Sequence, residues 1–240
     1  MKSTRKIIPA LAMLLISAVL MSTASFAWFS MNENVYATGM QVTAQPSSDI
    51  FLEISSDGTS FGLTAGAGLE GALLPAAHDE FTAVGDISNL VNSKWYYMVG
   101  TDATKSDAED DSRESITSFT NYVASTTFTV RANPNTTSTI HDVFVSEIAI
   151  TADLGGVTVI IAGKDGYQEF TVDTDGTFTT AATENILCQT VTSNEDDYDD
   201  QVITVYIFID GNHEDVFTNN SALLGGSVTF TLSASASSID

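Results

Sequence analysis

Three histidines are the side chains of this chain best suited to bind zinc or to move protons near neutral pH. Each precedes an acidic residue: His78-Asp79, His141-Asp142 and His213-Glu214. None belongs to an HExxH pattern, which would place two zinc ligands one helical turn apart. Convergence of the three in space would still make a zinc site, and a secreted metal-dependent peptidase is therefore one alternative. Their turn-like neighbours favour the other interpretation, polar loop residues.

Acidic clusters are the second source of chemistry. Carboxylates gather at 107–111 and 195–200, and a shorter Asp-x-Asp-Gly motif lies at 173–176. Calcium prefers several oxygen ligands, which loops of a β-rich protein can supply together. The candidate calcium ligands are Asp173, Asp175, Asp196 and Asp197. The alternative is solvated surface charge, because the motif lacks the later acidic ligand of an EF-hand loop.

No sequence motif for catalysis or for a cofactor accompanies these residues. The chain contains no GxSxG, no Walker-type loop and no GxGxxG,. Cys188 is the only cysteine, so no intramolecular disulfide can form,. Its apolar neighbours, Ile186 and Leu187, predict a buried, inert thiol,. The chain is therefore predicted not to be an enzyme and to need no cofactor, with a calcium site left open.

The N-terminus has the three parts of a secretory signal. Lys2, Arg5 and Lys6 precede an apolar run over 7–21, and small residues follow up to Ala27,. We predict a signal helix over 1–27 that signal peptidase cleaves between Ala27 and Trp28. An uncleaved membrane anchor is the alternative, because the apolar run nearly reaches spanning length. The mature chain is predicted to be extracellular, at the cell surface or in a matrix.

Charge narrows the range of partners. Removing 1–27 takes away three of the eight basic residues and none of the 31 acidic ones, which leaves a formal charge of −26. Such a surface repels phosphate backbones, so nucleic-acid binding is excluded. It also repels anionic lipid head groups.

The rest of the chain has the composition of β-strands. Short runs rich in Val, Ile, Thr, Phe and Tyr alternate with polar residues between turn signals, and residues 122–130 alternate without interruption,. The predicted strands are 35–44, 50–55, 95–99, 122–130, 143–151, 156–162, 167–172, 186–192, 201–209 and 226–234. This pattern predicts an all-β fold, an antiparallel β-sandwich forming one domain over 28–240, with immunoglobulin-like and jelly-roll topologies both open. A short turn or helix is expected at 86–91 and a long surface loop at 100–118.

The junction at residues 23–44, TASFAWFSMNENVYATGMQVTA, resembles exported proteins with a SipW-type signal peptide. These include the TasA and camelysin biofilm-matrix family of Gram-positive bacteria. The likeness lies in Ala27-Trp28-Phe29, a polar spacer, and Ala37-Thr38-Gly39-Met40 entering a strand, and the closing strand at 223–237 is also similar. The resemblance implies a jelly-roll subunit of extracellular fibres. Camelysin-like proteins have also been described as metallopeptidases, but this sequence contains no HExxH motif that could support that activity.

In such families the segment uncovered by cleavage can donate a strand to the next subunit. Here the residues that would do so are Trp28, Phe29, Val35, Met40 and Val42. An apolar, extended N-terminus is costly to leave in water, and adding it to a neighbour's open sheet edge satisfies backbone and side chains. The alternative is that 35–44 is the first strand of its own domain.

The function expected from these observations is a secreted, non-enzymatic structural protein of the cell surface or biofilm matrix that self-associates, with fibre assembly by strand donation as one form. The main alternative is a β-sandwich module that binds glycans or a host surface, either alone or with calcium bound by the acidic loops. Trp95-Tyr96-Tyr97 is the aromatic cluster that could stack on a sugar,.

Overall fold

The computed structural model describes residues 36–46, 52–90, 94–98, 113–133, 139–152, 155–173, 175–181, 186–191, 193–194, 197–198, 200–213, 216 and 226–237. All of them belong to one compact unit, Val35–Asp240. The predicted signal helix, the cleavage site at Ala27 and Trp28, and the assembly residues Phe29 and Val35 lie outside the described residues. The export signal therefore stays a prediction from the sequence.

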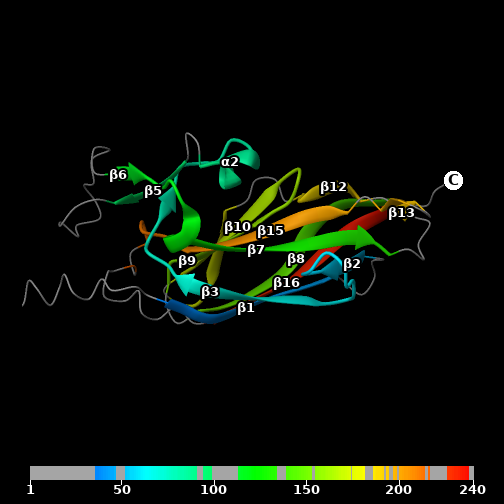
Figure 1. The fold of residues 1–240 in the computed structure, drawn as a ribbon, viewed down its shortest axis with the longest axis horizontal. Coiled ribbons are helices and arrows are strands. Elements are labelled where there is room, and N and C mark those ends of the chain that lie inside the picture. The colour runs from blue at the N-terminus through cyan, green and yellow to red at the C-terminus, as the bar shows by residue number, and fades with distance from the viewer. Residues whose placement is uncertain are drawn as a thin grey trace, which may run out of the picture. The chain divides into compact units, whose positions relative to one another are not determined.

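Two large sheets dominate the fold (Figure 1). Sheet A has the order β12-β8-β16-β1-β3, and sheet B has the order β11-β10-β9-β15-β7-β2. The strands of sheet A are β1 (Tyr36–Pro46), β3 (Ala65–Ala72), β8 (Thr139–Ala152), β12 (Cys188–Val191) and β16 (Gly226–Ser237). Those of sheet B are β2 (Leu52–Ser55), β7 (Val123–Ala132), β9 (Val157–Ala162), β10 (Tyr167–Val172), β11 (Phe178–Ala181) and β15 (Gln201–Ile209). The predicted β-rich architecture is thus confirmed.

The remaining elements are short. A three-stranded sheet joins β4 (Ala77–His78), β5 (Trp95–Met98) and β6 (Arg113–Ser115), and β13 (Ser193–Asn194) pairs with β14 (Asp197–Tyr198). Among the described residues, the helices are α2 (Gly85–Ser88) and the 3-10 turn η2 (Phe119–Asn121). Figure 1 shows β5, β6 and α2 on the side of sheet B opposite to β1, β3 and β16. We call β4, β5, β6, α2 and η2 the outer layer.

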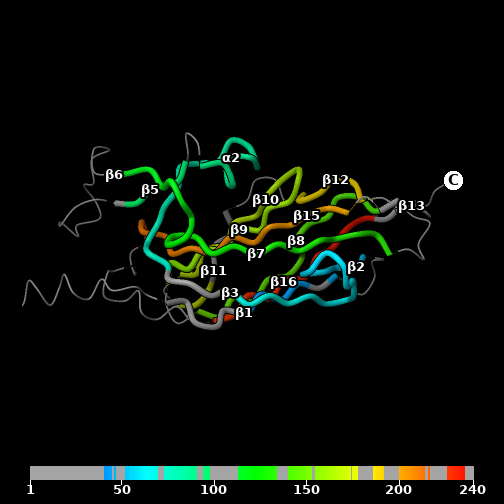
Figure 2. Tube along the Cα trace, viewed as in Figure 1, coloured from blue at the N-terminus to red at the C-terminus, as the bar shows by residue number. Residues whose placement is uncertain are grey.

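Sheet A is mixed, which corrects the prediction of purely antiparallel sheets. β1 runs parallel to β16, with Val42 opposite Val228 and Ala44 opposite Phe230, and antiparallel to β3. The first and last described strands are therefore neighbours, as the blue and red ends of the trace also show (Figure 2). A parallel pair needs a long crossover rather than a tight turn, and here nearly the whole domain forms that crossover.

Sheet B is buried on both faces along part of its length. In β9 every residue is buried, and Val159 and Ile161 pack in the core between sheets A and B. Ile160, on the opposite face of the same strand, packs under the outer layer. β15 divides in the same way, with Val205 toward sheet A and Phe208 toward the outer layer. Burial on both faces explains why 159–162 and 205–209 are continuous apolar runs,.

The strand predictions agree with the structure where residues alternate. In β7, Phe128 and Val130 face the core between the sheets as expected. Val123 has the opposite parity, so the same alternation turns it to the other face, under the outer layer. Tyr122, predicted on the core face, lies before β7 and also packs under the outer layer. The Gly/Ala-rich strand β3 was not predicted, because small residues give no alternating signal,.

Candidate functional site

The aromatic cluster predicted on 95–97 is divided among three environments. Trp95 is completely buried in the core below the outer layer. Tyr96 lies under the guanidinium of Arg113, whose Cζ is 4.5 Å from the ring centroid. Tyr97 is only partly buried, and its ring stacks on that of Tyr122, with centroids 5.2 Å apart and planes 24° apart. Tyr97 is therefore the member of the cluster placed to meet a ligand.

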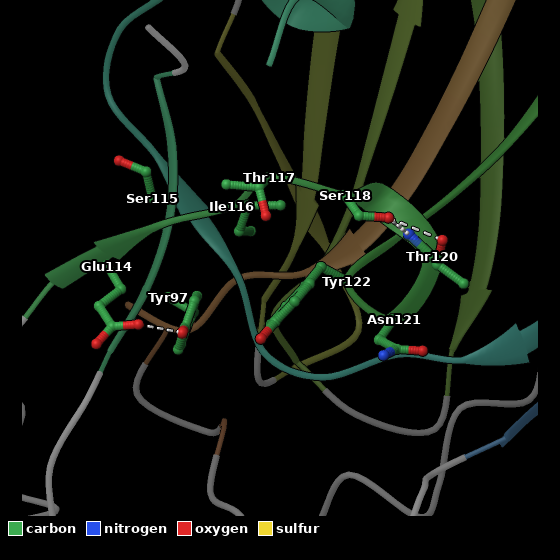
Figure 3. A pocket seen from close by; sticks show the side chains of 9 residues that line it. All are labelled: Tyr97, Glu114, Ser115, Ile116, Thr117, Ser118, Thr120, Asn121 and Tyr122. Atoms are coloured by element: carbon green, nitrogen blue, oxygen red, sulfur yellow. Dashed lines mark hydrogen bonds between the residues drawn. The ribbon is translucent and has the colours of Figure 1, made fainter. Parts of the chain in front are cut away.

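A hollow of about 280 Å³ opens beside this pair of tyrosines (Figure 3). Nine residues from β5, β6 and the segment that leads into β7 line it: Tyr97, Glu114, Ser115, Ile116, Thr117, Ser118, Thr120, Asn121 and Tyr122. Most of these side chains are polar and exposed, and Ile116 forms a buried floor. The hollow thus combines one aromatic wall with a polar rim.

The Tyr97 hydroxyl donates a hydrogen bond to Oε2 of Glu114, which fixes the orientation of the phenol. That bond, helped by partial burial and the charge of Glu114, raises the pKa of Tyr97 to about 12. Partial burial and then the charge of Glu114 also raise the pKa of Tyr122. Both phenols therefore stay protonated at any physiological pH, and one of them is fixed in orientation.

Backbone hydrogen bonds fix the walls of the hollow to the domain. The Ile116 amide donates to the Trp95 carbonyl at 3.0 Å, and the Leu74 amide donates to the Asn121 carbonyl at 2.6 Å. The Ser118 hydroxyl accepts from the Thr120 amide at 3.4 Å and so caps η2. The tyrosine pair stands on these anchored segments, which prepares the hollow before any ligand arrives.

A second polar group lies between the outer layer and sheet B. His78 Nε2 is 3.2 Å from Glu169 Oε1, and His78 Nδ1 is 3.0 Å from the carbonyl oxygen of Asp79. Because each ring nitrogen faces an oxygen, the imidazolium form can donate to both. The ring stacks on Phe81 with centroids 4.2 Å apart and meets Trp95 edge-on at 5.0 Å.

The electrostatics of this pair favour the charged histidine. Burial alone lowers the pKa of His78, but the hydrogen bond and charge of Glu169 outweigh it and raise the pKa above its ordinary value of 6.5. Nearby, burial raises the pKa of Asp210, although its carboxylate accepts from the Asn212 amide at 2.9 Å. When His78 is protonated, it forms an ion pair with Glu169 that joins two layers.

The three histidines do not meet in one place. His78 ends β4, His141 lies in β8 of sheet A, and His213 follows β15. No group of three or more His, Cys, Asp or Glu side chains suited to a metal ion occurs among the residues that the structure describes. The arrangement therefore lends no support to a zinc-dependent peptidase.

Of the four predicted calcium ligands, two lie in the turn between β10 and β11. The Asp175 carboxylate accepts from the Thr177 amide at 2.9 Å and from its hydroxyl at 2.5 Å. The hydroxyl bond, followed by the amide bond, lowers the pKa of Asp175. Asp173 contributes backbone bonds to the same turn. Asp196 lies outside the described residues, and for Asp197 only the backbone, in β14, is described.

Of the five predicted assembly residues, two fall in the described strand β1. Val42 is fully buried in the core between the sheets. The backbone of Met40 pairs with Leu69 of β3. Cys188 is also buried, as predicted, where β12 begins.

Sequence reasoning found Tyr97 but missed its two partners. Glu114 is 17 residues away, in a stretch predicted as loop. Tyr122 continues the alternation of 122–130, which predicted it as a strand residue on the core face. Glu169 is 91 residues from His78, and no local pattern connects them.

Within the described part of the chain, no helix has the length and hydrophobicity needed to cross a bilayer. No family model, curated protein or solved structure matches the chain. Inference about function therefore rests on the geometry and the sequence.

Proposed function

We propose that this chain is an exported, non-enzymatic structural protein of the cell surface or biofilm matrix, and that it assembles with its own copies through β1. The observation that carries this proposal is the position of β1. The strand that follows the predicted cleavage site lies inside sheet A, between β16 and β3, rather than at an edge. We further propose that the two large sheets form a jelly-roll-like sandwich.

The contacts of β1 are those of a strand that fills a slot. From Gln41 to Pro46 its backbone pairs with β16 on one side, and from Tyr36 to Ala44 with β3 on the other. The side chains of Val42 and Ala44 are both 0% exposed. Without β1, sheet A would have two unpaired edges and an uncovered apolar strip, which is a template for pairing with another chain.

The connectivity allows the slot to be filled from outside. β1 precedes every other described strand, and the next strand, β2, belongs to the opposite sheet. No tight turn therefore connects β1 to either of its neighbours in sheet A. An identical strand from a second copy would make the same hydrogen bonds and bury the same side chains, which is the condition for strand exchange at low cost. Repeated head-to-tail exchange would produce a fibre.

Electron microscopy of the protein recovered from the cell surface tests this proposal. We expect filaments that lengthen with protein concentration. A matched variant with Val42→Asp would place a charge in the slot and prevent assembly, whereas Gln41→Asp, at an exposed position of the same strand, would leave it intact,. Protein that stays monomeric at high concentration, with and without calcium, would contradict the proposal.

A further inference from the structure

We propose that the hollow beside Tyr97 and Tyr122 is a binding site for a neutral pyranose sugar. The inference does not rest on assembly through β1, because every residue that lines the hollow lies outside sheet A. It assigns to the outer layer a recognition role beyond the structural role proposed above.

The aromatic wall supplies the first element of sugar recognition. The two rings form a stacked pair that is partly exposed at the surface, so each ring supports the orientation of the other. Flat aromatic faces suit the face of a pyranose ring that carries C–H groups. Tyrosine also loses little conformational entropy on binding, because it has only two side-chain torsions.

The polar rim supplies the second element. Glu114 uses Oε2 to accept from Tyr97, and its other carboxylate oxygen retains the capacity to accept from sugar hydroxyls,. Ser115, Thr117 and Asn121 add exposed hydroxyl and amide groups that can both donate and accept. A few convergent polar groups beside an aromatic surface are typical of small-molecule sites.

Charge and size select among sugars. Glu114 lies in the hollow and the chain carries a net charge of −23, so sulfated, phosphorylated and uronic sugars are repelled,. Arg113, the residue before Glu114, is turned to Tyr96 and to the Asp79 carboxylate, which its Nη1 reaches at 3.0 Å. At about 280 Å³ the hollow is smaller than the roughly 300–1,000 Å³ of drug-sized sites,. It therefore suits one or two sugar units at the end or along the side of a glycan chain.

To test the proposal, the full exported protein is titrated with cellotetraose and with chitotetraose, and binding is measured by NMR or by tyrosine fluorescence. We expect millimolar binding of at least one of these neutral oligosaccharides and none of polygalacturonate. Tyr122→Ala should weaken binding at least tenfold, whereas Tyr122→Phe, which keeps the ring, should stay within about twofold of the parent.

A pair of charge variants controls for general effects of the acidic surface. Glu114→Gln should weaken sugar binding severalfold, and Glu147→Gln, at an exposed position on β8, should leave it unchanged. In a Trp28→Phe background, the fluorescence of buried Trp95 reports whether each variant has kept the outer layer folded. The proposal is overturned if neither oligosaccharide binds. It is also overturned if Tyr122→Ala and Glu114→Gln keep the parental affinity for sugar while the outer layer stays folded. Binding of choline without binding of sugar would show that the hollow recognises a cation, and would overturn the proposal as well.

Discussion

The two cores of this protein, one on each face of sheet B, are built on different principles. The core between sheets A and B is largely aliphatic, and most of its members are Val, Ile, Leu and Ala. The core under the outer layer is smaller and richer in aromatic residues, with Trp95, Phe81 and Phe208 among its ten buried members. It also contains His78, which contacts all three of these rings. The stability of the first core comes from buried apolar area. That of the second comes also from the geometry of its ring contacts and from the titratable pair His78 and Glu169.

This difference assigns different roles to the two regions. The aliphatic core joins strands from the whole length of the described chain, from Val42 to Leu232, so its loss unfolds the domain. The outer layer packs on one face of sheet B through the smaller core and through backbone bonds such as that between Ala76 and the end of β15. We expect the outer layer to open at a lower free energy than the two large sheets.

The largest effect should come from truncating one ring in each core. Phe230→Ala and Trp95→Ala each remove a fully buried ring and should cost about 3–5 kcal/mol,. We expect Phe230→Ala to lower the free energy of global unfolding, because Phe230 packs against Phe128 across the sheets. Trp95→Ala should instead release the outer layer. Hydrogen exchange checks this: Trp95→Ala should accelerate the amides of β5 and α2 and spare those of β8. Equal acceleration in β8 would show that the two cores are one cooperative unit.

A smaller effect should follow from adding a methyl group where two backbone segments approach closely on the aliphatic side. A Cβ on Gly163 would lie 2.2 Å from the carbonyl oxygen of Leu187, so Gly163→Ala should cost about 3 kcal/mol by forcing the backbones apart,. Gly85→Ala in the outer layer is the matched control, since a Cβ there meets nothing within 4 Å. Chemical denaturation of both variants measures the contrast. A Gly163→Ala protein as stable as Gly85→Ala would disprove the close approach.

A change of pH should affect the stability of the outer layer more than that of the aliphatic core. The pKa of His78 is raised in the folded protein, so the stability that this residue contributes is complete below its ordinary value of 6.5 and is lost as pH rises through the raised pKa,. Burial also raises the pKa of Asp210, so its contribution is lost as pH rises from its ordinary value of 3.8 through the raised pKa, a window that begins below that of His78,. The outer layer should therefore be held more firmly at pH 6 than at pH 8.

Glu169→Gln tests the source of that pH dependence. Removing the carboxylate should cost the outer layer about 2 kcal/mol near pH 6 and should flatten its pH profile. Hydrogen exchange of β5 at several pH values, corrected for intrinsic rates, gives the profile, with β16 as the internal reference. If β5 keeps the parental pH dependence in Glu169→Gln, the ion pair is not responsible.

The smallest perturbation uses reporters that the chain already has. Cys188 lies in the aliphatic core and Trp95 in the aromatic core, and both are nearly inaccessible. In mild denaturant, Trp95 fluorescence, measured in a Trp28→Phe background, should change before Cys188 reacts with a thiol reagent. Simultaneous changes would contradict separate opening.

The sequence predicted those parts of the fold that have a local signal. Alternation identified the strands and the core positions Phe128 and Val130, and apolar neighbours identified the buried Cys188. The parallel pairing of Val42 with Val228 could not be foreseen, because it joins opposite ends of the chain and the same strands would also fit an antiparallel order.

The same limit applies to the candidate site. An aromatic run identified Tyr97, but its role depends on Glu114 and Tyr122, which the outer layer brings to it from separate segments. The pattern that includes Tyr122 predicted a strand, whereas the structure ends η2 at that residue and so turns its ring to Tyr97. The role of Tyr97 therefore depends on the residues that contact it, and the sequence around Tyr97 does not reveal them.

The central claim is that β1 occupies a slot which a strand from another copy can fill, and cross-linking tests it most directly. Thr43 and Thr229 face each other across the β1–β16 pair and are partly exposed. Thr43→Cys and Thr229→Cys proteins would be prepared separately, mixed under assembly conditions and oxidised, with each variant alone and the parent, which has only buried Cys188, as controls. The proposal predicts a disulfide-linked heterodimer in the mixture and ladders from the double variant. A mixture without heterodimer, beside a double variant that closes its disulfide only within one chain at every concentration, would contradict it.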